Sequence, residues 1–355
     1  MLDQNIKEKP SSDGRINQES LLSIVVPVFN ETGVISVFYT RLKKVVDSLS
    51  SLSYEIIFID DGSKDDSYQK LIDIANLDPN VKVIKFSRNF GHQIAITAGI
   101  DMAKGDAVVV IDADLQDPPE VIVKFVEKWK EGYDVVYGVR ETREGETWLK
   151  LLTAKLFYKT LKTFSKVDIP VSVGDFRLMS RRVVEQLKEM RERDRFVRGL
   201  VSWVGFNQTG VHYPRDKRHA GETKYPYMKM IQFAVDGITS FSTVPLRLAT
   251  WLGYLASFLA FLYACSVFVQ KAMGYTVQGW ATMMVGVLFL GGVQLICLGI
   301  LGEYIGRIFN EIKERPLYII QEVYDLHKGA KSRAVEGVVE ERGFQRPAGR
   351  TLPQD

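Results

Sequence analysis

The fold of this chain is indicated most clearly by YEIIFIDDGS, residues 54–63, in which an apolar run leads into two carboxylates and a glycine. A second stretch, AVVVIDAD at residues 107–114, likewise ends in two carboxylates. Short apolar runs bounded by turn residues are typical of strands buried on both faces of a parallel sheet. Ligands of such sheets bind at the carboxyl ends of the strands. The two stretches therefore place four carboxylates at one edge of a sheet, where their mutual repulsion predicts a bound cation.

Strands and helices are predicted to alternate through the first 140 residues. We expect strands at residues 22–28, 54–60, 81–86, 107–112 and 133–138. We expect helices at residues up to about 49, about 65–76, 92–103 and after the prolines at 118 and 119. This alternation indicates βαβ units with right-handed crossovers, and thus an α/β fold with a mostly parallel sheet and flanking helices. No GxGxxG motif follows the first strand, which argues against an oxidoreductase-type dinucleotide fold.

Two apolar stretches in the second half of the chain are long enough to cross a membrane. They run over residues 246–269 and 280–301, and each exceeds the about 20 residues that span a hydrocarbon layer. The short connection carries Lys271 as its one charge, and Arg307 and Lys313 follow the second stretch. The positive-inside tendency then predicts an integral membrane protein with both termini in the cytoplasm. Two buried core helices of a soluble protein are the alternative.

Charge is distributed unevenly along the chain, although the formal net charge is only +3. Acidic side chains outnumber basic ones up to residue 139, and basic ones predominate over residues 140–232. The acidic part suits recruitment of a metal ion. The basic part lies beside the apolar stretches, so it favours anionic lipid head groups as partners and not nucleic acid.

The remaining segments are assigned from their patterns. Residues 147–166 have lysines on one side of a helical pattern and apolar residues on the other, which predicts an amphipathic helix in the membrane interface; docking on the soluble core is the alternative. The expected organisation is a disordered start at 1–20, a cytoplasmic α/β domain at 21–225, a membrane-proximal helix at 226–245, a two-helix transmembrane hairpin at 246–302, a cytoplasmic helix and extension at 303–325, and a disordered tail at 326–355.

Several motifs occur in a consistent order along the chain. They are PVFNE at 27–31, DDGS at 60–63, DADLQDP at 112–118 and VGDFR at 173–177. This order resembles the inverting nucleotide-sugar glycosyltransferases of the GT-A type, and more narrowly the polyprenyl-phosphate glycosyltransferases, which include dolichyl-phosphate mannosyltransferases. RDKRHAGETKY at 215–225 and ILGEYIGR at 300–307 resemble the bactoprenol glucosyltransferases of the GtrB type. The resemblance covers residues from about 22 to 324.

The resemblance implies a GT-A, Rossmann-like domain that moves one sugar, with inversion, from a UDP-sugar to polyprenyl phosphate at the cytoplasmic face of a bacterial plasma membrane. It favours UDP-glucose as donor, while mannose from GDP-mannose and an amino-arabinose stay open. It also implies a homo-oligomer. A processive polysaccharide synthase is an alternative, but such enzymes commonly have more spans and a QxxRW-type motif, whose Gln is absent around 198–203. A non-catalytic sugar-nucleotide sensor or membrane scaffold is the third possibility.

The acidic triplet is the candidate metal site. A divalent ion acts as a Lewis acid that neutralises a diphosphate leaving group. Mg²⁺ or Mn²⁺ takes oxygen ligands and commonly uses one or two carboxylates together with phosphates and water. We therefore expect Asp114 to be the primary ligand, with Asp112 and Gln116 beside it.

The resemblance also assigns roles to residues elsewhere at this edge of the sheet. The expected donor-binding residues are Pro27, Asn30, Glu31, Asp60, Asp61 and Asp112. Arg88 lies in a loop at the same edge and is expected near the diphosphate, with a surface charge as the alternative. Asp175 is implied near the acceptor, as a base or as an orienting group, and Arg177 beside it is a candidate phosphate contact; a structural turn is the alternative for both. Planar arginines suit phosphate groups. Arg215, Arg218 and Lys224 are therefore the expected acceptor-phosphate residues, with a mobile basic loop as the alternative.

Other polar residues are expected to have ordinary roles. The four histidines show no metal-ligand spacing, so surface or packing positions are predicted for His92, His212, His219 and His327. Cys265 and Cys297 fall inside the apolar stretches and indicate neither a disulfide nor a zinc site. Glu303 and Arg307 are four residues apart on one predicted helix and should form an ion pair.

Overall fold

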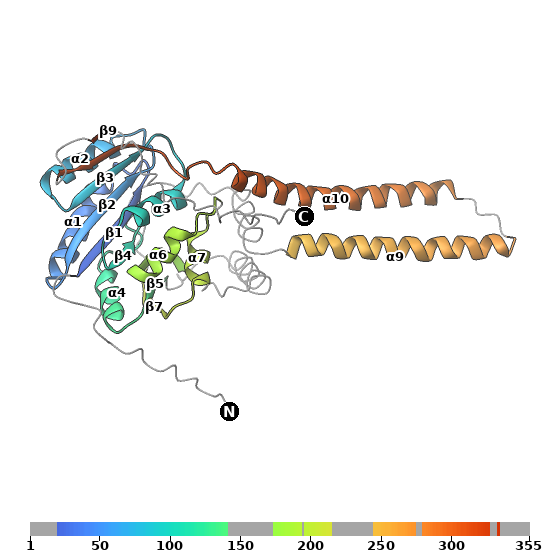
Figure 1. Cartoon of the computed structure of the whole chain (residues 1–355), viewed down its shortest axis with the longest axis horizontal. Coiled ribbons are helices and arrows are strands. Elements are labelled where there is room, and N and C mark those ends of the chain that lie inside the picture. The colour runs from blue at the N-terminus through green and yellow to red at the C-terminus, as the bar shows by residue number, and fades with distance from the viewer. Residues whose placement is uncertain are drawn as a thin grey trace, which may run out of the picture.

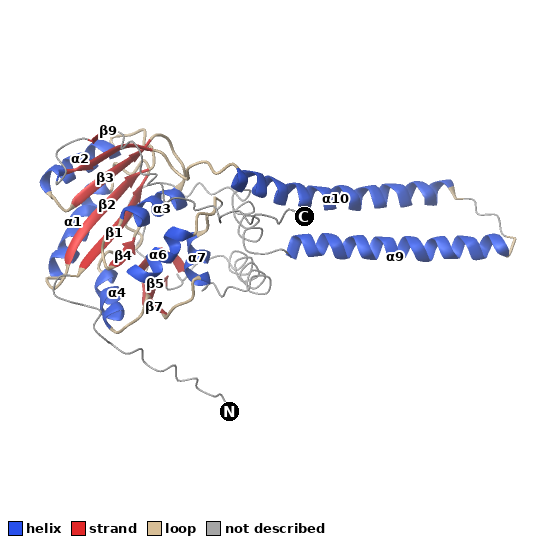
Figure 2. Cartoon of the chain, in the orientation of Figure 1, coloured by secondary structure: helices blue, strands red, loops and turns tan. Residues whose placement is uncertain are grey.

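The edge of the sheet that carries the acidic motifs is built by parallel strands at the centre of an α/β unit. The computed structural model describes residues 20–140, 173–193, 195–214, 244–274, 279–326 and 332–333. A long helical hairpin extends away from the sheet and its helices (Figure 1). Figure 2 shows that all strands belong to the α/β unit and that the hairpin is purely helical.

The described strands form one nine-stranded sheet in the order β7-β5-β6-β4-β1-β2-β3-β8-β9. Their bounds are β1 Leu21–Val28, β2 Ser53–Asp60, β3 Val81–Phe86, β4 Ala107–Val110, β5 Val135–Arg140, β6 Val173–Ser180, β7 Gln208–Tyr213, β8 Ile320–Asp325 and β9 Ser332–Arg333. The central strands β4, β1, β2 and β3 are parallel. Antiparallel strands flank them, because β6 pairs with β4 and β8 pairs with β3.

Helices cover both faces of the sheet and bury a separate apolar core on each. Their bounds are α1 Ile35–Ser48, α2 Ser67–Leu77, α3 His92–Met102, α4 Val121–Lys130, α6 Arg181–Glu189 and α7 Val197–Trp203. One core includes Phe38 of α1 and Phe125 of α4. The other includes Ile96 of α3 and Leu200 of α7. Burial on both faces explains why the central strands are almost continuously apolar.

The predicted fold class is confirmed. The structure has the five expected strands, β1 to β5, with ends that differ by at most two residues. The fourth strand ends at Val110 and not at residue 112, because the chain turns there and Leu115 adopts a positive φ of 60°. Strands β6, β7 and β8 were not predicted; β6 and β8 add antiparallel pairs to the sheet, whereas β7 pairs parallel with β5.

The hairpin consists of α9 (Val244–Ala272) and α10 (Trp280–Ile312), which lie side by side in Figure 1. Residues 249–270 and 285–312 are long and apolar enough to cross a membrane, and their side chains are almost all exposed. Core helices of a soluble protein would be buried, so that alternative is wrong. The expected ion pair at the base of α10 is present, with Arg307 Nε 3.0 Å from Glu303 Oε1.

Several predicted segments cannot be compared with the structure. The amphipathic helix at 147–166 and residues 226–243 of the membrane-proximal helix lie outside the described residues, as do residues 1–19 and most of the tail. Within the tail, Ser332–Arg333 form the short strand β9 against β8, where disorder had been expected.

A buried ion pair fastens the loop after β4 to the neighbouring strands. Asp117 has a side chain only 1% exposed and accepts hydrogen bonds from Arg140 Nη2 at 2.8 Å and from the Tyr213 hydroxyl at 2.6 Å. Three residues later, Glu120 pairs with Arg41 at 2.8 Å, but 55% of the Glu120 side chain is exposed. The two carboxylates therefore offer a matched comparison of buried and exposed pairing.

We expect Asp117→Asn to destabilise the chain by about 3 kcal/mol, because it leaves the partly buried Arg140 without its counter-charge. Glu120→Gln should cost less than about 1 kcal/mol, because water screens an exposed pair. Thermal unfolding of the purified protein in detergent measures both. Equal losses for the two variants would contradict the structural role given to Asp117.

Candidate functional site

The acidic motifs meet at one edge of the sheet. Asp60 is the last residue of β2 and lies opposite Val28, the last residue of β1. Asp112 follows β4 by two residues. Because β6 runs antiparallel to β4, its beginning, with Asp175, lies at the same edge. The predicted convergence of these carboxylates therefore follows from strand direction.

Asp60 and Asp61 are both buried but have different surroundings. Asp60 Oδ1 accepts a 3.3 Å hydrogen bond from the Ser63 backbone, whereas its buried Oδ2 has no hydrogen-bond partner among the described residues. Burial raises the pKa of Asp60. Asp61 accepts hydrogen bonds from the backbone N–H groups of Phe90, at 2.6 Å, and Gly91, at 2.9 Å. Burial raises the pKa of Asp61 as well, and these two bonds limit the rise.

The PVFNE segment is joined to the DDGS turn by hydrogen bonds. Pro27 is buried in β1 opposite Ile59. Asn30 has a φ of 56°, its N–H donates to Ser63 Oγ at 3.0 Å, and its Oδ1 accepts from the Lys64 N–H at 2.8 Å. The Glu31 N–H donates to Ser67 Oγ at 2.8 Å. These residues therefore help to fold the turn as well as to line the edge of the sheet.

Gly62 brings this turn against the loop that follows β3. Its φ is 71°, and a Cβ built on it would lie 2.7 Å from the carbonyl carbon of Arg88. Only glycine fits such an approach without displacing the neighbouring backbone. Arg88 itself is exposed at this edge, with its guanidinium carbon 4.0 Å from the centre of the Phe90 ring.

The acidic triplet forms a tight turn beyond β4. Asp114 Oδ1 accepts the Gln116 N–H at 3.0 Å, which places Asp114 and Gln116 together. Asp112 Oδ1 is buried and accepts no hydrogen bond from a described residue. Burial raises the pKa of Asp112 to about 6; the charge of His92 opposes this rise, and the carboxylates of Asp175 and Asp114 add to it.

These oxygens fit a divalent metal that is completed by its substrate. Among the described residues, no three or more acidic, histidine or cysteine side chains converge to enclose an ion. Mg²⁺ and Mn²⁺ sites that bind phosphates commonly use only one or two carboxylates, and the open Asp112 oxygen is a suitable ligand. Asp112, Asp114 and the Gln116 side chain are the residues that could hold such an ion.

Asp175 is held by several partners at once. Arg198 of α7 donates to both its oxygens, at 2.8 and 2.9 Å, and Gln93 Nε2 donates at 3.2 Å. His92 Nε2 lies 3.2 Å from Asp175 Oδ2 and 3.5 Å from Asp112 Oδ1. Burial opposes ionisation of Asp175, but the bonds to Arg198 and His92 prevail and hold its pKa well below the usual range.

His92 was expected to have an ordinary surface or packing role, and this prediction is wrong. Its ring bridges two carboxylates of the site. Burial lowers the pKa of His92, but the bond to Asp175 and the charges of Asp112 and Asp175 outweigh this effect and raise the pKa to about 9. The raised pKa favours the positively charged imidazole beside these two carboxylates.

Comparison with known proteins identifies the family. Residues 23–188 match the family model "Glycosyl transferase family 2", and residues 244–308 match "GtrB C-terminal hairpin". The uncharacterized glycosyltransferase YkcC of Bacillus subtilis (strain 168) is 55% identical to this chain, over 86% of this chain and 94% of that protein. The chain belongs to glycosyltransferase family 2. The predicted resemblance to the GtrB type is confirmed by the hairpin match.

Two further proteins are similar to this family 2 glycosyltransferase. The bactoprenol glucosyl transferase of Shigella phage SfII is 47% identical, over 84% of this chain and 97% of that one. A solved structure of glucosyl-3-phosphoglycerate synthase from Mycobacterium tuberculosis, in complex with Mn²⁺, UDP-glucose and phosphoglyceric acid, is 21% identical with a TM-score of 0.42. That alignment covers 61% of this chain and 76% of the other, and is too weak to carry an argument about the site.

The other predicted site residues of the glycosyltransferase are either buried in the sheet or not among the described residues. Arg177 is 3% exposed, sits two residues further into β6 than Asp175, and donates to the Gly174 carbonyl at 2.8 Å. Burial lowers the pKa of Arg177 to about 10, although the charge of Asp175 opposes this effect. Arg215, Arg218 and Lys224 are not among the described residues.

The sequence reasoning missed His92, Gln93 and Arg198. His92 and Gln93 had a usable signal, because they open the helix after Phe90-Gly91 at the end of a parallel strand. Arg198 had no usable signal in the sequence. It lies 23 positions from Asp175, and Asp175 belongs to a strand that was not predicted.

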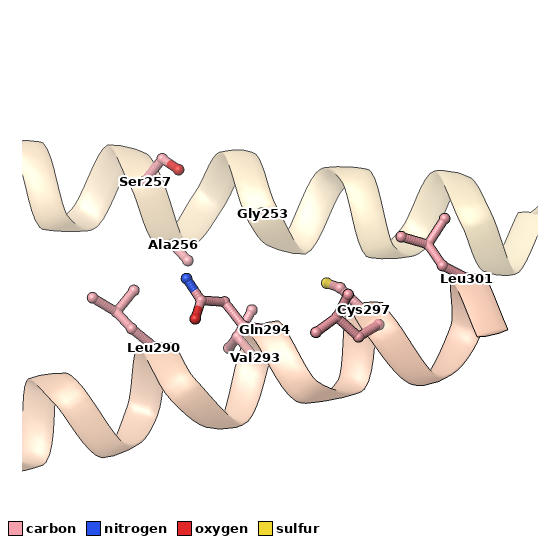
Figure 3. A pocket seen from close by; sticks show the side chains of 9 residues that line it. Gly253, Ala256, Ser257, Leu290, Val293, Gln294, Cys297 and Leu301 are labelled. Carbon is pink, nitrogen blue, oxygen red and sulfur yellow. The ribbon is translucent and has the colours of Figure 1, made fainter.

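A cavity of about 410 Å³ lies elsewhere, between α9 and α10 (Figure 3). Small and apolar side chains line most of it, together with the amide of Gln294 and the thiol of Cys297. It contains no carboxylate or basic group, so it offers none of the chemistry of the acidic edge.

We expect Arg198→Leu to destabilise the chain by about 3 kcal/mol at pH 7, because it leaves buried Asp175 with incomplete charge compensation. The folded-state pKa of Asp175 is lowered, so its stabilising contribution is present above the unfolded value of about 4 and is lost as pH falls through the folded value. The deficit of the variant should therefore shrink below pH about 4.

Thermal unfolding of wild type and Arg198→Leu, measured between pH 3 and 7, tests this expectation. Arg198→Lys serves as the control, because it keeps the charge but loses the bidentate geometry, and it should lose less stability. A deficit that does not change with pH would argue against charge compensation as the role of Arg198.

Proposed function

We propose that this chain transfers one glucose from UDP-glucose to polyprenyl phosphate, with inversion at the sugar carbon. The observation that supports this most is a similarity to bactoprenol glucosyl transferases that extends over 84% of the chain, through both the sheet and the hairpin. The acidic edge suits a sugar nucleotide, and the hairpin suits an acceptor dissolved in the membrane.

The donor base and ribose are proposed to bind beside the DDGS turn. Asp60 Oδ2, which is buried and accepts no hydrogen bond from a described residue, is proposed to accept an N–H of the base, with Pro27, Asn30 and Glu31 beside it. Asp61 is proposed to serve the ribose, and it also anchors the loop that carries Arg88. Arg88 then offers a cation for the diphosphate.

The metal is proposed to be Mg²⁺ or Mn²⁺, held by Asp114 and Asp112 with Gln116 beside them. When bound, the ion would act as a Lewis acid that neutralises charge on the departing diphosphate.

In the proposed reaction, an oxygen of the acceptor phosphate forms a bond to C1 of the glucose while the bond from C1 to the diphosphate breaks. UDP leaves with the electron pair of that bond, and a single displacement inverts C1. A phosphomonoester has a second pKa of about 6, so the nucleophile is already largely ionised and needs no strong base. Asp175, whose pKa is low, is then suited to orient Arg198 and His92, with Arg177 behind it.

The acceptor phosphate is proposed to bind Arg215, Arg218 and Lys224. Basic residues beyond α10, among them Lys313 and Arg315, favour a cytoplasmic location of the α/β unit and both termini. Self-association of the hairpin into a homo-oligomer completes the proposal.

Purified protein, incubated with labelled UDP-glucose, polyprenyl phosphate and Mg²⁺ or Mn²⁺, should form one glucosylated lipid and no polymer. Asp114→Asn should reduce the rate by at least about 100-fold, because it removes a ligand of a metal worth several kcal/mol. Asp73→Asn, which alters an exposed carboxylate on α2, is the control. Undiminished transfer in the presence of a chelator would refute the metal, and transfer from GDP-mannose alone would refute the donor.

Replacing Arg215 and Arg218 together by Gln should raise the KM for polyprenyl phosphate by about 10-fold or more, with little change in the KM for UDP-glucose. Arg315→Gln is the control, because it removes a membrane-proximal charge outside the proposed acceptor loop. Steady-state kinetics with each substrate varied in turn make the comparison. A change limited to the donor KM would assign these arginines to the donor side.

A further inference from the structure

The chain returns from the hairpin to the α/β unit and packs beside the proposed donor site. After α10 ends at Ile312, the chain leads to β8, which pairs antiparallel with β3. Figure 1 shows this returning segment running from α10 to the sheet beside β3. We call residues 313–319 the return segment.

Tyr318 fixes the return segment by two kinds of contact. Its ring stacks on Phe86, the last residue of β3, with centroids 5.3 Å apart and an interplanar angle of 15°. Its hydroxyl donates to Asp101 Oδ2 at 2.8 Å, at the end of α3. Arg191 also binds Asp101, with Nη1 2.8 Å from the same oxygen. Tyr318 therefore joins the end of β3 to the end of α3.

The ring contacts continue into the loop at the donor site. Phe86 meets Phe90 edge to face, with centroids 5.6 Å apart and an interplanar angle of 86°. The Ser87 N–H donates to the Ile319 carbonyl at 3.0 Å, so the return segment also holds the first residue of this loop. The other end of the loop is held by Asp61, through the N–H groups of Phe90 and Gly91.

We propose that Tyr318 is a positioning residue for the donor site: by stacking on Phe86 it fixes the loop over residues 87–91. The inference rests on the proposed function, because it assigns the donor to the surface formed by this loop and Asp61. Tyr318 touches neither substrate and acts through Phe86 and Phe90. The hairpin is thereby linked to the donor site by the chain that leaves the membrane.

Strand β8, which follows the return segment, offers a matched control. Tyr324 is buried in the opposite core, where its hydroxyl donates to Asn76. A change at Tyr324 loosens β8 without touching Phe86 or the loop. Variants at Tyr318 and Tyr324 therefore separate a specific effect on the loop from a general weakening of β8.

The first test is amide hydrogen exchange of the nucleotide-free, full-length protein in detergent. Tyr318→Leu should speed exchange at Phe90 and Gly91, whose N–H groups bind Asp61, whereas Tyr324→Leu should not. Tyr318→Phe keeps the stacked ring and should restore slow exchange. Unchanged exchange in Tyr318→Leu would overturn the proposal whatever the protein binds. Tyr318→Met, which fills the space without stacking, takes the place of the leucine variant if that variant does not fold.

The second test is binding of UDP with Mn²⁺, together with donor and acceptor KM. Tyr318→Leu should weaken UDP binding and raise the donor KM by about 10-fold, the factor expected from one aromatic contact, with the acceptor KM unchanged. Tyr318→Phe should stay within about threefold of wild type. An equal effect of Tyr324→Leu would overturn the inference. Failure of the wild type to bind UDP would refute the proposed function instead. The hydrogen-exchange rates would still decide whether Tyr318 fixes the loop.

Discussion

Compensation of negative charge at the carboxyl edge of the sheet is the constraint on which the site depends. The carboxylates are not equivalent in this respect. Asp61 is compensated by two backbone N–H groups and Asp175 by Arg198 and His92. Asp60 and Asp112 each keep a buried oxygen that accepts no hydrogen bond from a described residue, and that oxygen of Asp112 has only a longer contact with His92, at 3.5 Å. The expectation that all four motif carboxylates tolerate one another only around a cation is therefore too broad. Uncompensated oxygens remain at Asp60 and at Asp112 in the acidic triplet, and the proposed metal would offset the charge of the triplet.

The parts of the fold that could be predicted are those dominated by burial on both faces. Strands β1 to β3 consist largely of apolar residues between turn signals, so their ends were predicted within one residue. Strand β6 is equally buried but contains Asp175 and Arg177, and these charges hide it in the sequence. The partners of Asp175 come from α3 and α7, which only the tertiary fold brings to this strand, and so no local pattern could reveal it.

The candidate site likewise consists of residues that the sequence could predict and residues that it could not. Asp60, Asp112 and Asp114 follow strands directly, and strand direction alone predicts that they share an edge. His92 and Arg198 reach this edge from helices on one face of the sheet, 83 and 23 positions from Asp175. Motif order could point to Asp175, but it could not provide the cations that keep this residue ionised. Sequence patterns thus located the charges of the site and missed the groups that balance them.

The return segment holds the proposed donor loop at the outer side of the parallel strands, through the bond between Ser87 and Ile319 and the pairing of β8 with β3. Strand β8 pairs with the outer edge of the parallel strands, and its contacts join residues more than 200 positions apart in the sequence. Because only the two-residue strand β9 of the described strands lies outside it, β8 can detach at a lower free-energy cost than β1 or β2, which are buried between neighbouring strands and under helices. If the hairpin moves relative to the sheet, the strain falls first on the return segment, because it directly connects the two. A donor site that includes the loop beside Tyr318 would then respond to the state of the membrane anchor, while Asp112 and Asp175, which are held by β4, β6 and α7, would keep their geometry.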